Sequence, residues 1–346
     1  DAVDPAQTDD DYPQKLFNPL LYTGNGSDNR NITGVGFAPD WVWIKSRTDA
    51  EGHQIYDTTR GAEKRLQQNS GGAEETTTDK FQAFQSDGFQ VGSSNDLNKS
   101  SSNFVAWNWR ANGGTTAANS VGGTSSVTQV DPSKALSIVT YTGFSGSSGS
   151  STVGHGMGVA PAMIIHKSRS RESGWWTQFP NLLTNAGYFL DLSGTGAQTD
   201  LNSYGTMNVP TDAVFTINGV DGVGGESATY VAYCFANIDG YCKVGSYEGN
   251  GNADGTFVNT GFRPAWIMTK SVDSTSNWQI FDDKRLGYNV DNNELQANEA
   301  AAEATTDMID ILSNGFKLRI ATDPNVAETY IYMAFAENPF KYATAR

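Results

Sequence analysis

The sequence GFAPDWVWIK at Gly36–Lys45 returns as GVAPAMIIHK at Gly158–Lys167 and as GFRPAWIMTK at Gly261–Lys270. Each copy is a Gly-x-x-Pro turn followed by an apolar run that ends in lysine. A turn signal before a short run rich in β-branched and aromatic residues predicts a β-strand. The three stretches therefore predict the same strand three times.

Apolar residues occupy both faces of these strands. Side chains alternate along a strand, so Trp41 and Trp43 point to one face while Val42 and Ile44 point to the other. Burial on both sides is the usual reason for such a pattern. We expect one face to meet the core of a sandwich and the other to meet a neighbouring module or subunit.

Other segments repeat in the same order around these strands. Modules one and three also share Gln-Ile-aromatic-Asp at 54–57 and 279–282, whereas the middle copy diverges between 175 and 211. Repeats of this length predict a triplicated module. The positions that recur as anchors are Tyr22, Pro39, Trp41 and Trp43 in module one, Tyr141 and Pro161 in module two, and Tyr247, Pro264 and Trp266 in module three.

Turn signals recur every 8 to 12 residues and long helical periodicity is scarce. This spacing predicts an all-β fold of three tandem, homologous, antiparallel β-sandwich modules. Asn292–Ala304, rich in Glu and Ala, predicts one short helix. The expected boundaries are an acidic, mobile arm at 1–18, module one at 19–110, a flexible Gly/Ser/Thr-rich linker at 111–135, module two at 136–240 and module three at 241–346.

Composition excludes several classes of function. The 38 acidic and 23 basic residues give a net charge of −15, and no Lys/Arg stripe is present, so we expect no nucleic-acid binding. No apolar run approaches the ~20 residues that span a bilayer, so we expect no membrane insertion. Cys234 and Cys242 are too few for a disulfide framework, and two buried free thiols are the favoured interpretation over a cross-strand pair.

The residues that could support chemistry form no known motif. The histidines His53, His155 and His166 share no metal-ligand spacing, and we expect no metal and no cofactor. Asn250–Gly255 resembles the start of a calcium loop, but the twelfth position is Gly261 rather than glutamate, so a turn is favoured. Gly143–Gly149 lacks the lysine of a phosphate-binding loop and is predicted to be an ordinary loop.

Two recurring carboxylates are candidates for acid/base residues. Asp57 and Asp282 occupy equivalent positions, which a glycosidase pair would also require. Module two has Pro180 at that position, and an active site does not usually persist in two copies and vanish in a third. We therefore expect no catalytic residues and assign both aspartates to turns or caps.

Exposed aromatic residues are the one feature with binding potential. Trp175 and Trp176 are adjacent in the divergent module and lie near Arg169 and Arg171. A stacking ring with polar neighbours suits sugar recognition. Because Trp176 aligns with Trp278, we expect Trp176 in the core and Trp175 free, which makes Trp175, Arg169 and Arg171 a candidate glycan site.

As a set, the anchors resemble a repeated module of virion structural and tail-fibre proteins from marine and environmental tailed phages. The resemblance extends from Leu21 onward and rests on YTGNG at 22–26, the Gly-Phe-x-Pro-x-Trp strand, Arg60-Gly61, Ser86–Phe89 and Val105–Trp109. Those proteins often carry the module downstream of a concanavalin-like lectin domain, and a start at Asp1 is compatible with release from a longer precursor. The resemblance transfers no catalytic residues.

The sequence thus predicts a non-enzymatic structural protein on the exterior of a tailed-phage virion, as a fibre or spike component or a capsid decoration protein. Its expected partners are other virion proteins and further copies of itself, contacted through the aromatic strands and the 1–18 arm. The alternatives are a carbohydrate-binding adhesin with a host-glycan site in module two, and a polysaccharide-degrading enzyme that uses Asp57 or Asp282.

Overall fold

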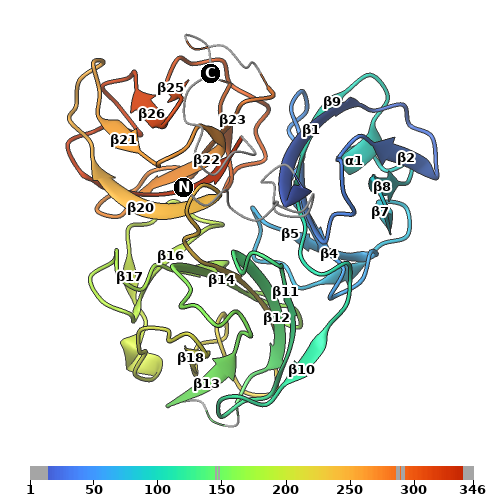
Figure 1. Ribbon diagram of the computed structural model, residues 1–346. Helices are drawn as coiled ribbons and strands as arrows, with labels where there is room; N and C mark the ends of the chain where they lie inside the picture. Colours follow the sequence, from blue (N-terminus) through green and yellow to red (C-terminus); the bar gives the residue numbers. More distant parts are fainter. Residues whose placement is uncertain (1–14, 145, 147–148, 286–288, 290–292, 338–346) are drawn as a thin grey trace, which may run out of the picture.

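The computed structural model describes residues 15–144, 146, 149–285, 289 and 293–337. Antiparallel strands dominate the fold, which confirms the all-β prediction. The strands form three lobes around a common centre (Figure 1). Each lobe has one large sheet and one small sheet.

Lobe 1 holds the first nine strands. Its large sheet has the order β1-β9-β3-β4-β5-β6 and its small sheet the order β2-β8-β7. The elements are β1 (Phe17–Thr23), β2 (Arg30–Thr33), β3 (Trp41–Ser46), β4 (Gln54–Asp57), β5 (Lys64–Gln67), β6 (Glu75–Thr76), β7 (Phe81–Gln85), β8 (Gly88–Val91), the short helix α1 (Asn95–Asn98) and β9 (Asn103–Trp109).

Lobe 2 has the widest sheet, β10-β11-β12-β19-β14-β15-β16-β17, and the two-stranded sheet β13-β18. The elements are β10 (Ala117–Asn119), β11 (Ser126–Val130), β12 (Leu136–Thr142), β13 (Ser150–Gly154), β14 (Met163–Ser168), β15 (Trp176–Gln178), β16 (Tyr188–Asp191), β17 (Thr199–Asp200), the 3-10 helix η3 (Asn202–Tyr204), β18 (Val214–Asn218) and β19 (Thr229–Phe235).

Lobe 3 has the sheets β20-β27-β22-β23-β24 and β21-β26-β25. The order β1-β9-β3-β4-β5 of lobe 1 thus returns as β12-β19-β14-β15-β16 and as β20-β27-β22-β23-β24. The elements of lobe 3 are β20 (Cys242–Glu248), β21 (Phe257–Asn259), β22 (Pro264–Ser271), β23 (Gln279–Asp282), β24 (Leu295–Gln296), β25 (Ile309–Leu312), β26 (Gly315–Leu318) and β27 (Thr329–Ala336).

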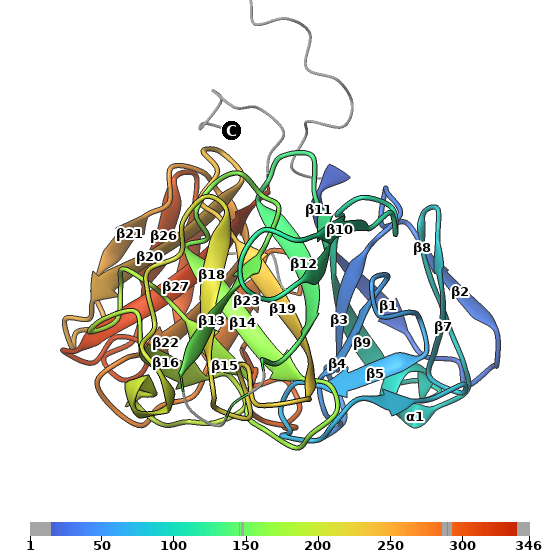
Figure 2. The ribbon, with the colours of Figure 1, turned by 90° about the horizontal axis from the view of Figure 1, so that it is seen from below.

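Two-sided burial of the first repeated strand is confirmed. Val42 and Ile44 belong to the cluster between the two sheets of lobe 1. Trp41 and Trp43 belong to a second cluster that also contains Trp266 of lobe 3 and residues of lobe 2. The large sheets therefore turn their outer faces toward one another, and the molecule has a central core in addition to one core per lobe (Figure 2).

Aromatic rings fill the centre. Trp41 stacks on Tyr233 of lobe 2 with ring centroids 4.8 Å apart, and Trp109 meets Phe335 of lobe 3 at 5.5 Å. Phe235 meets Phe335 at 6.1 Å. The sequence predicts that a second copy of the chain contacts the aromatic strands. In the structure the neighbouring lobes of the same chain cover those faces.

The anchor tyrosines make the same contacts in all three lobes. Each stacks on the aromatic residue opposite it in the last strand of its lobe, and its hydroxyl donates to a loop carbonyl. The glycine two positions later lies against backbone, where a Cβ atom would meet a carbonyl oxygen at about 2 Å. The hydroxyl contacts are Tyr22 to Leu97 O at 2.7 Å, Tyr141 to Val223 O at 2.6 Å and Tyr247 to Pro324 O at 2.8 Å.

The lobes contact one another in a closed cycle: lobe 2 on lobe 1, lobe 1 on lobe 3, and lobe 3 on lobe 2. Each contact includes a main-chain hydrogen bond at a corresponding place in the strand order. These bonds run from Glu74 N to Arg169 O at 2.8 Å, from Glu303 N to Arg47 O at 2.9 Å and from Gln198 N to Val272 O at 3.1 Å.

Three local predictions differ from the structure. The expected linker at 111–135 contains β10 and β11, because the edge of β12 offers hydrogen-bonding groups that composition does not reveal. Phe17, assigned to the mobile arm, begins β1 and is buried against Phe335. The described part of the expected helix, 293–304, contains β24 and an isolated bridge, because β24 pairs with β23. The rest of the predicted arm, 1–14, lies outside the described residues.

Candidate functional site

The recurring aspartates lie in the contacts between lobes. Asp57 accepts hydrogen bonds from Arg60 N at 2.8 Å, from Arg60 Nε at 2.5 Å and from the Tyr233 hydroxyl of lobe 2 at 2.7 Å. The side chains of Asp57 and Arg60 are both fully buried. A carboxylate with this many donors and no access to solvent is suited to holding two lobes together, not to moving a proton for a substrate.

Asp282 repeats the arrangement between lobes 1 and 3. It accepts from Arg285 Nε at 2.6 Å and from the Trp107 indole of lobe 1 at 2.9 Å, and the Asp282–Arg285 pair is again fully buried. Trp107 holds the same place in β9 that Tyr233 holds in β19, two residues before the last aromatic residue of the strand. We call this set of aspartate, arginine and a donor from the neighbouring lobe the relay. The same relay is therefore present at two of the three lobe contacts.

At the third contact every polar member of the relay is replaced by an apolar residue. Strand pairing places Phe179 and Leu182 of lobe 2 where the other lobes have Asp and Arg, one position before the Pro180 expected from the sequence, and β27 has Met333 where the other lobes have a donor. Phe179 and Met333 both belong to the central core, and Leu182 packs against it. Because donor, acceptor and counter-ion change together, the aspartates serve as packing elements.

The predicted site residues are placed differently from expectation. Trp175 is fully buried and its indole N–H donates to Ser70 O of lobe 1 at 3.1 Å, whereas Trp176 is partly exposed and packs on the core of lobe 2. The residue equivalent to Trp278, whose indole donates to Asp191 O of lobe 2 at 3.0 Å, is therefore Trp175. The sequence expectation was wrong by one position, and Trp175 has no open face for a sugar.

The two arginines lie in different surroundings. Arg169 forms a bidentate ion pair with Glu74 of lobe 1, through Nε and Nη2 at 2.8 Å each. Arg171 pairs with the exposed Asp221 of its own lobe. The structure thus does not bring Trp175, Arg169 and Arg171 together as one binding surface.

The histidines are packing residues in this structure. All three are buried, and Trp43 donates its indole N–H to His53 Nδ1 at 2.8 Å. Burial lowers the pKa of His53 well below its usual value and lowers the pKa of His166 to about 3. Among the described residues no group of three or more His, Cys, Asp or Glu side chains is placed to hold a metal ion.

The remaining sequence motifs have structural explanations. In the Asn250–Gly255 segment, Asn250 Oδ1 and Asn252 Oδ1 accept main-chain N–H groups of the same loop, as a turn requires. Parts of the Gly143–Gly149 loop lie outside the described residues. Both cysteines are buried free thiols. No helix in the described part of the chain combines the length and apolarity needed to cross a membrane.

The lysine that ends each repeated strand is also buried. Lys45, Lys167 and Lys270 each have a pKa lowered to about 8, chiefly because burial disfavours the charged form. Lys270 Nζ donates to Ser271 O at 2.7 Å and to Ser276 Oγ at 3.1 Å. Lys167 Nζ instead crosses to lobe 1 and donates to Gly71 O at 2.8 Å.

These lysines predict a pH dependence of stability. In the unfolded chain a lysine titrates near pH ~10.4, so between about pH 8 and that value the folded protein binds fewer protons than the unfolded chain. The contribution of Lys270 to the free energy of unfolding therefore rises as pH increases from 8 toward 10, and it is lost as pH falls back through 8. The stability difference between wild type and Lys270→Met should shift by about 1–2 kcal/mol in favour of wild type between pH 8 and 10.

Urea unfolding of both proteins at pH 8 and pH 10 measures this shift, and contributions from the other titrating groups, including Lys45 and Lys167, are common to both proteins and cancel in the difference. The matched control is Lys284→Met, because the Lys284 side chain is 45% exposed. A difference for Lys270→Met that does not change with pH contradicts the assignment.

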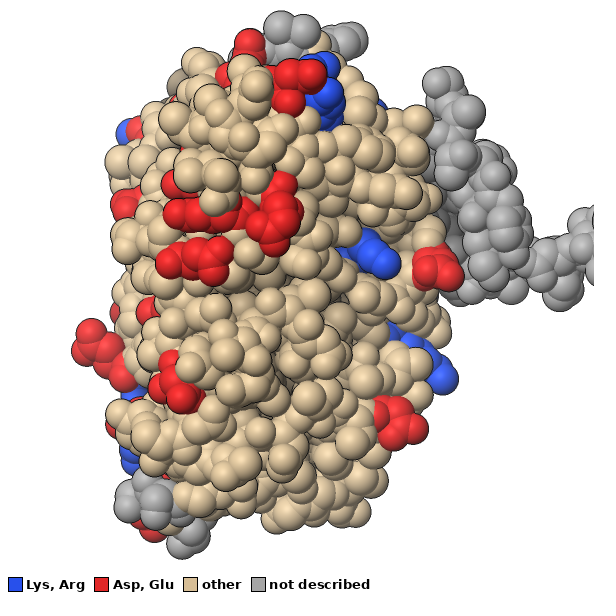
Figure 3. Space-filling view, turned by 90° about the vertical axis from the view of Figure 1, so that its left-hand side faces the viewer, with Lys and Arg blue, Asp and Glu red and all other residues tan. Residues whose placement is uncertain are grey.

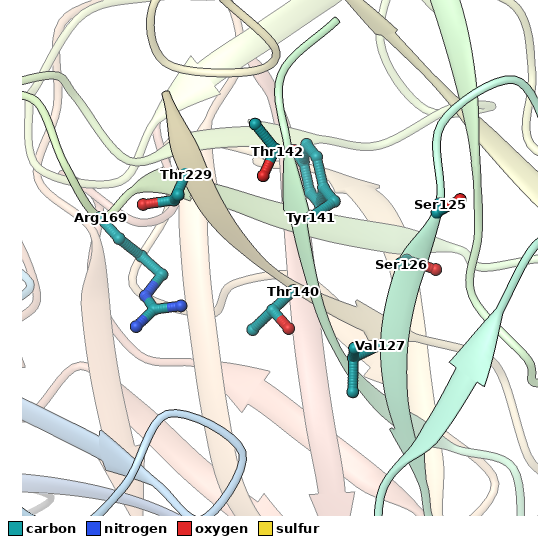
Figure 4. Close-up of a pocket in the computed structure, with 8 residues that line it drawn as sticks. All are labelled: Ser125, Ser126, Val127, Thr140, Tyr141, Thr142, Arg169 and Thr229. Atoms are coloured by element: carbon teal, nitrogen blue, oxygen red, sulfur yellow. The ribbon is translucent and has the colours of Figure 1, made fainter. Parts of the chain in front are cut away.

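A shallow groove lies on the surface of lobe 2. It has a volume of about 270 Å³ and lies beside lobe 1 (Figure 4). Strands β11, β12 and β19 form its floor and one wall, and Arg169 projects into it from the other side. Its lining residues are Ser125, Ser126, Val127, Thr140, Tyr141, Thr142, Arg169 and Thr229. Sequence reasoning found Arg169 but missed the threonines, which have no motif.

Comparison with known proteins gives one family. A family model described as a domain of unknown function, DUF7483, matches residues 12–339. No curated protein and no solved structure matches the chain. Since the model covers nearly the whole sequence, the chain belongs to the DUF7483 family.

Proposed function

We propose that this chain is a non-enzymatic structural protein on the exterior of a tailed-phage virion, either a fibre or spike component or a capsid decoration protein. We further propose that its three lobes are copies of one module closed into a ring. The resemblance of the repeated anchors to virion modules supports the first proposal. The common strand order and the cyclic lobe contacts support the second.

One observation carries the structural role. The charged pairs that could take part in acid/base chemistry are fully buried and join lobes. These pairs are Asp57 with Arg60 and Asp282 with Arg285. Their replacement by apolar residues at the third lobe contact is expected for a packing role. A ring of rigid sheets that offers large surfaces suits a particle component.

The surface charge fits a densely displayed protein. The net charge is −15, and acidic side chains gather on the face shown in Figure 3. Mutual repulsion between copies keeps such a protein soluble at high local concentration. Partners among other virion proteins and further copies of the chain remain predictions, and contacts between copies would use surfaces other than the aromatic strands.

Localisation tests this proposal. Purified particles of the phage that encodes the chain should contain it in stoichiometric amounts by quantitative mass spectrometry. Immunogold labelling of intact particles should decorate the head or the tail from outside. Recovery of the chain only from the soluble lysate, with none in purified particles, contradicts the proposal.

A carbohydrate-binding adhesin is the second candidate. The observation in its favour is the groove in lobe 2, which is lined by solvent-exposed residues such as Val127, whereas Trp175 is buried. Whole-particle adsorption to host cells, competed by the purified chain, supports this candidate. Unchanged adsorption in the presence of excess chain counts against it.

A further inference from the structure

We propose that the groove in lobe 2 is a binding site for a neutral saccharide. The proposal rests on the exterior location proposed above, because only an exposed protein meets a surface glycan. It names a different site from the Trp175 patch, and four features of the groove carry it.

The first feature is a set of hydroxyls on one face. Thr140 and Thr142 are two positions apart on β12 and therefore project to the same side. Thr142 lies directly opposite Thr229 on β19, and Thr140 lies opposite Val127 on β11. Among the described residues these three threonine hydroxyls have no hydrogen-bond partner. They are free to donate to and accept from a ligand.

The second feature is a comparison with the other lobes. The pair Thr142–Thr229 corresponds to Thr23–Asn103 in lobe 1 and to Glu248–Thr329 in lobe 3. In those lobes the paired side chains bond to each other, at 2.9 Å and 3.0 Å respectively. Only lobe 2 leaves both members of the pair open, among the residues that the structure describes.

The third feature is the wall that lobe 2 adds. Among the described strands, those equivalent to β12 in lobes 1 and 3 are edge strands, whereas in lobe 2 β11 and β10 extend the sheet beyond β12. This extension gives the threonine face a side wall, and Val127, 38% exposed, supplies its apolar part. Gln129 of β11 donates to the hydroxyls of Thr58 and Thr59 in lobe 1, which fixes the wall in place.

The fourth feature is charge. Arg169 is neutralised by its bidentate contact with Glu74, and none of the described residues that line the groove is a carboxylate. An anion therefore gains little from Arg169 and is repelled by the acidic protein, while a cation finds no counter-charge. Arg169 Nη1 has no partner among the described residues and remains a donor.

These features select the class of ligand. The main chain of β12 is paired with β11 on one side and β19 on the other, so a peptide cannot add as a strand. The uncharged hydroxyls of a sugar need partners that both donate and accept hydrogen bonds, and threonine hydroxyls do both. Val127 can contact the C–H face of a sugar ring. At about 270 Å³ the groove is near the lower end of small-molecule sites, which fits one sugar ring of a longer chain.

The test uses the full chain and a panel of neutral disaccharides, namely maltose, cellobiose, lactose and N,N′-diacetylchitobiose, in saturation-transfer NMR. We expect at least one to bind. Binding should weaken about tenfold or more in Thr142→Val/Thr229→Val, which removes two hydroxyls and keeps the side-chain volume. The control is Thr23→Val, the equivalent position in lobe 1, which should bind like wild type.

A second variant, Thr140→Trp, places an indole in the groove and should abolish binding. Thermal unfolding of each variant verifies that the fold is kept. Binding by none of the disaccharides, or binding that survives both groove variants, overturns the proposal. Failure here with the chain present in particles leaves the proposed exterior location standing, whereas binding by a chain absent from particles overturns only that location.

Discussion

Replacing Asp57 by alanine should destabilise the protein by about 3–5 kcal/mol, because it leaves the Arg60 guanidinium buried without its principal counter-ion. The Tyr233 hydroxyl of lobe 2 loses its acceptor in the same step. The loss of stability therefore falls on the contact between lobes 1 and 2. Equilibrium urea unfolding measures it.

The control for this variant is Asp221→Ala. Asp221 also pairs with an arginine, Arg171, but its side chain is 65% exposed, so the loss should stay below about 1 kcal/mol. Equal losses in the two variants would contradict the assignment of Asp57 to a buried relay.

The third lobe contact suggests a rescue of the first variant. The buried pair is replaced there by Phe179 and Leu182. The double variant Asp57→Leu/Arg60→Leu removes both charges at once, and it should be less destabilised than the sum of the two single losses. Additive losses would show that the two side chains act independently.

Replacing Trp41 by alanine should also have a large effect, about 3–5 kcal/mol, because it opens a cavity where lobes 1 and 2 meet. Its ring contacts Trp109 at a centroid distance of 4.2 Å and Tyr233 of lobe 2 at 4.8 Å. The variant should lose stability and should also expose hydrophobic surface as the lobes separate. Urea unfolding and binding of a hydrophobic dye report the two effects.

Tyr204→Ala is the matched control for Trp41, since it removes a large aromatic side chain that is 45% exposed. Its effect should stay within about 0.5 kcal/mol. A Trp41 variant as stable as the Tyr204 variant would mean that the central core does not hold the lobes together.

The anchors show how far sequence reasoning reaches. Tyr22, Trp41 and their counterparts were identified from repetition, and the alternation in Trp41–Ile44 predicted that both faces are buried. What covers the outer face was left open between a module and a subunit. The cyclic contact of the lobes settles it, because lobe 2 and lobe 3 supply the covering residues.

The candidate site was far less predictable. Trp175 was assigned to the surface because an alignment within the module cannot tell which face meets a neighbouring lobe, and an error of one position exchanges the two faces of a strand. The groove escaped detection because Thr140, Thr142 and Thr229 become neighbours only when β19 returns beside β12.

By itself, the sequence determined the strands, their alternation and the recurring anchors, because turn chemistry and side-chain period act over a few residues. The tertiary structure decided everything that depends on distant partners. It placed β10 and β11 in a stretch that looked flexible, buried the aspartates between lobes, and left the hydroxyls of Thr142 and Thr229 without a partner among the described residues. Burial and hydrogen bonding depend on which surfaces meet, and in this chain the partners lie 108 residues apart at Trp175 and 176 residues apart at Asp57.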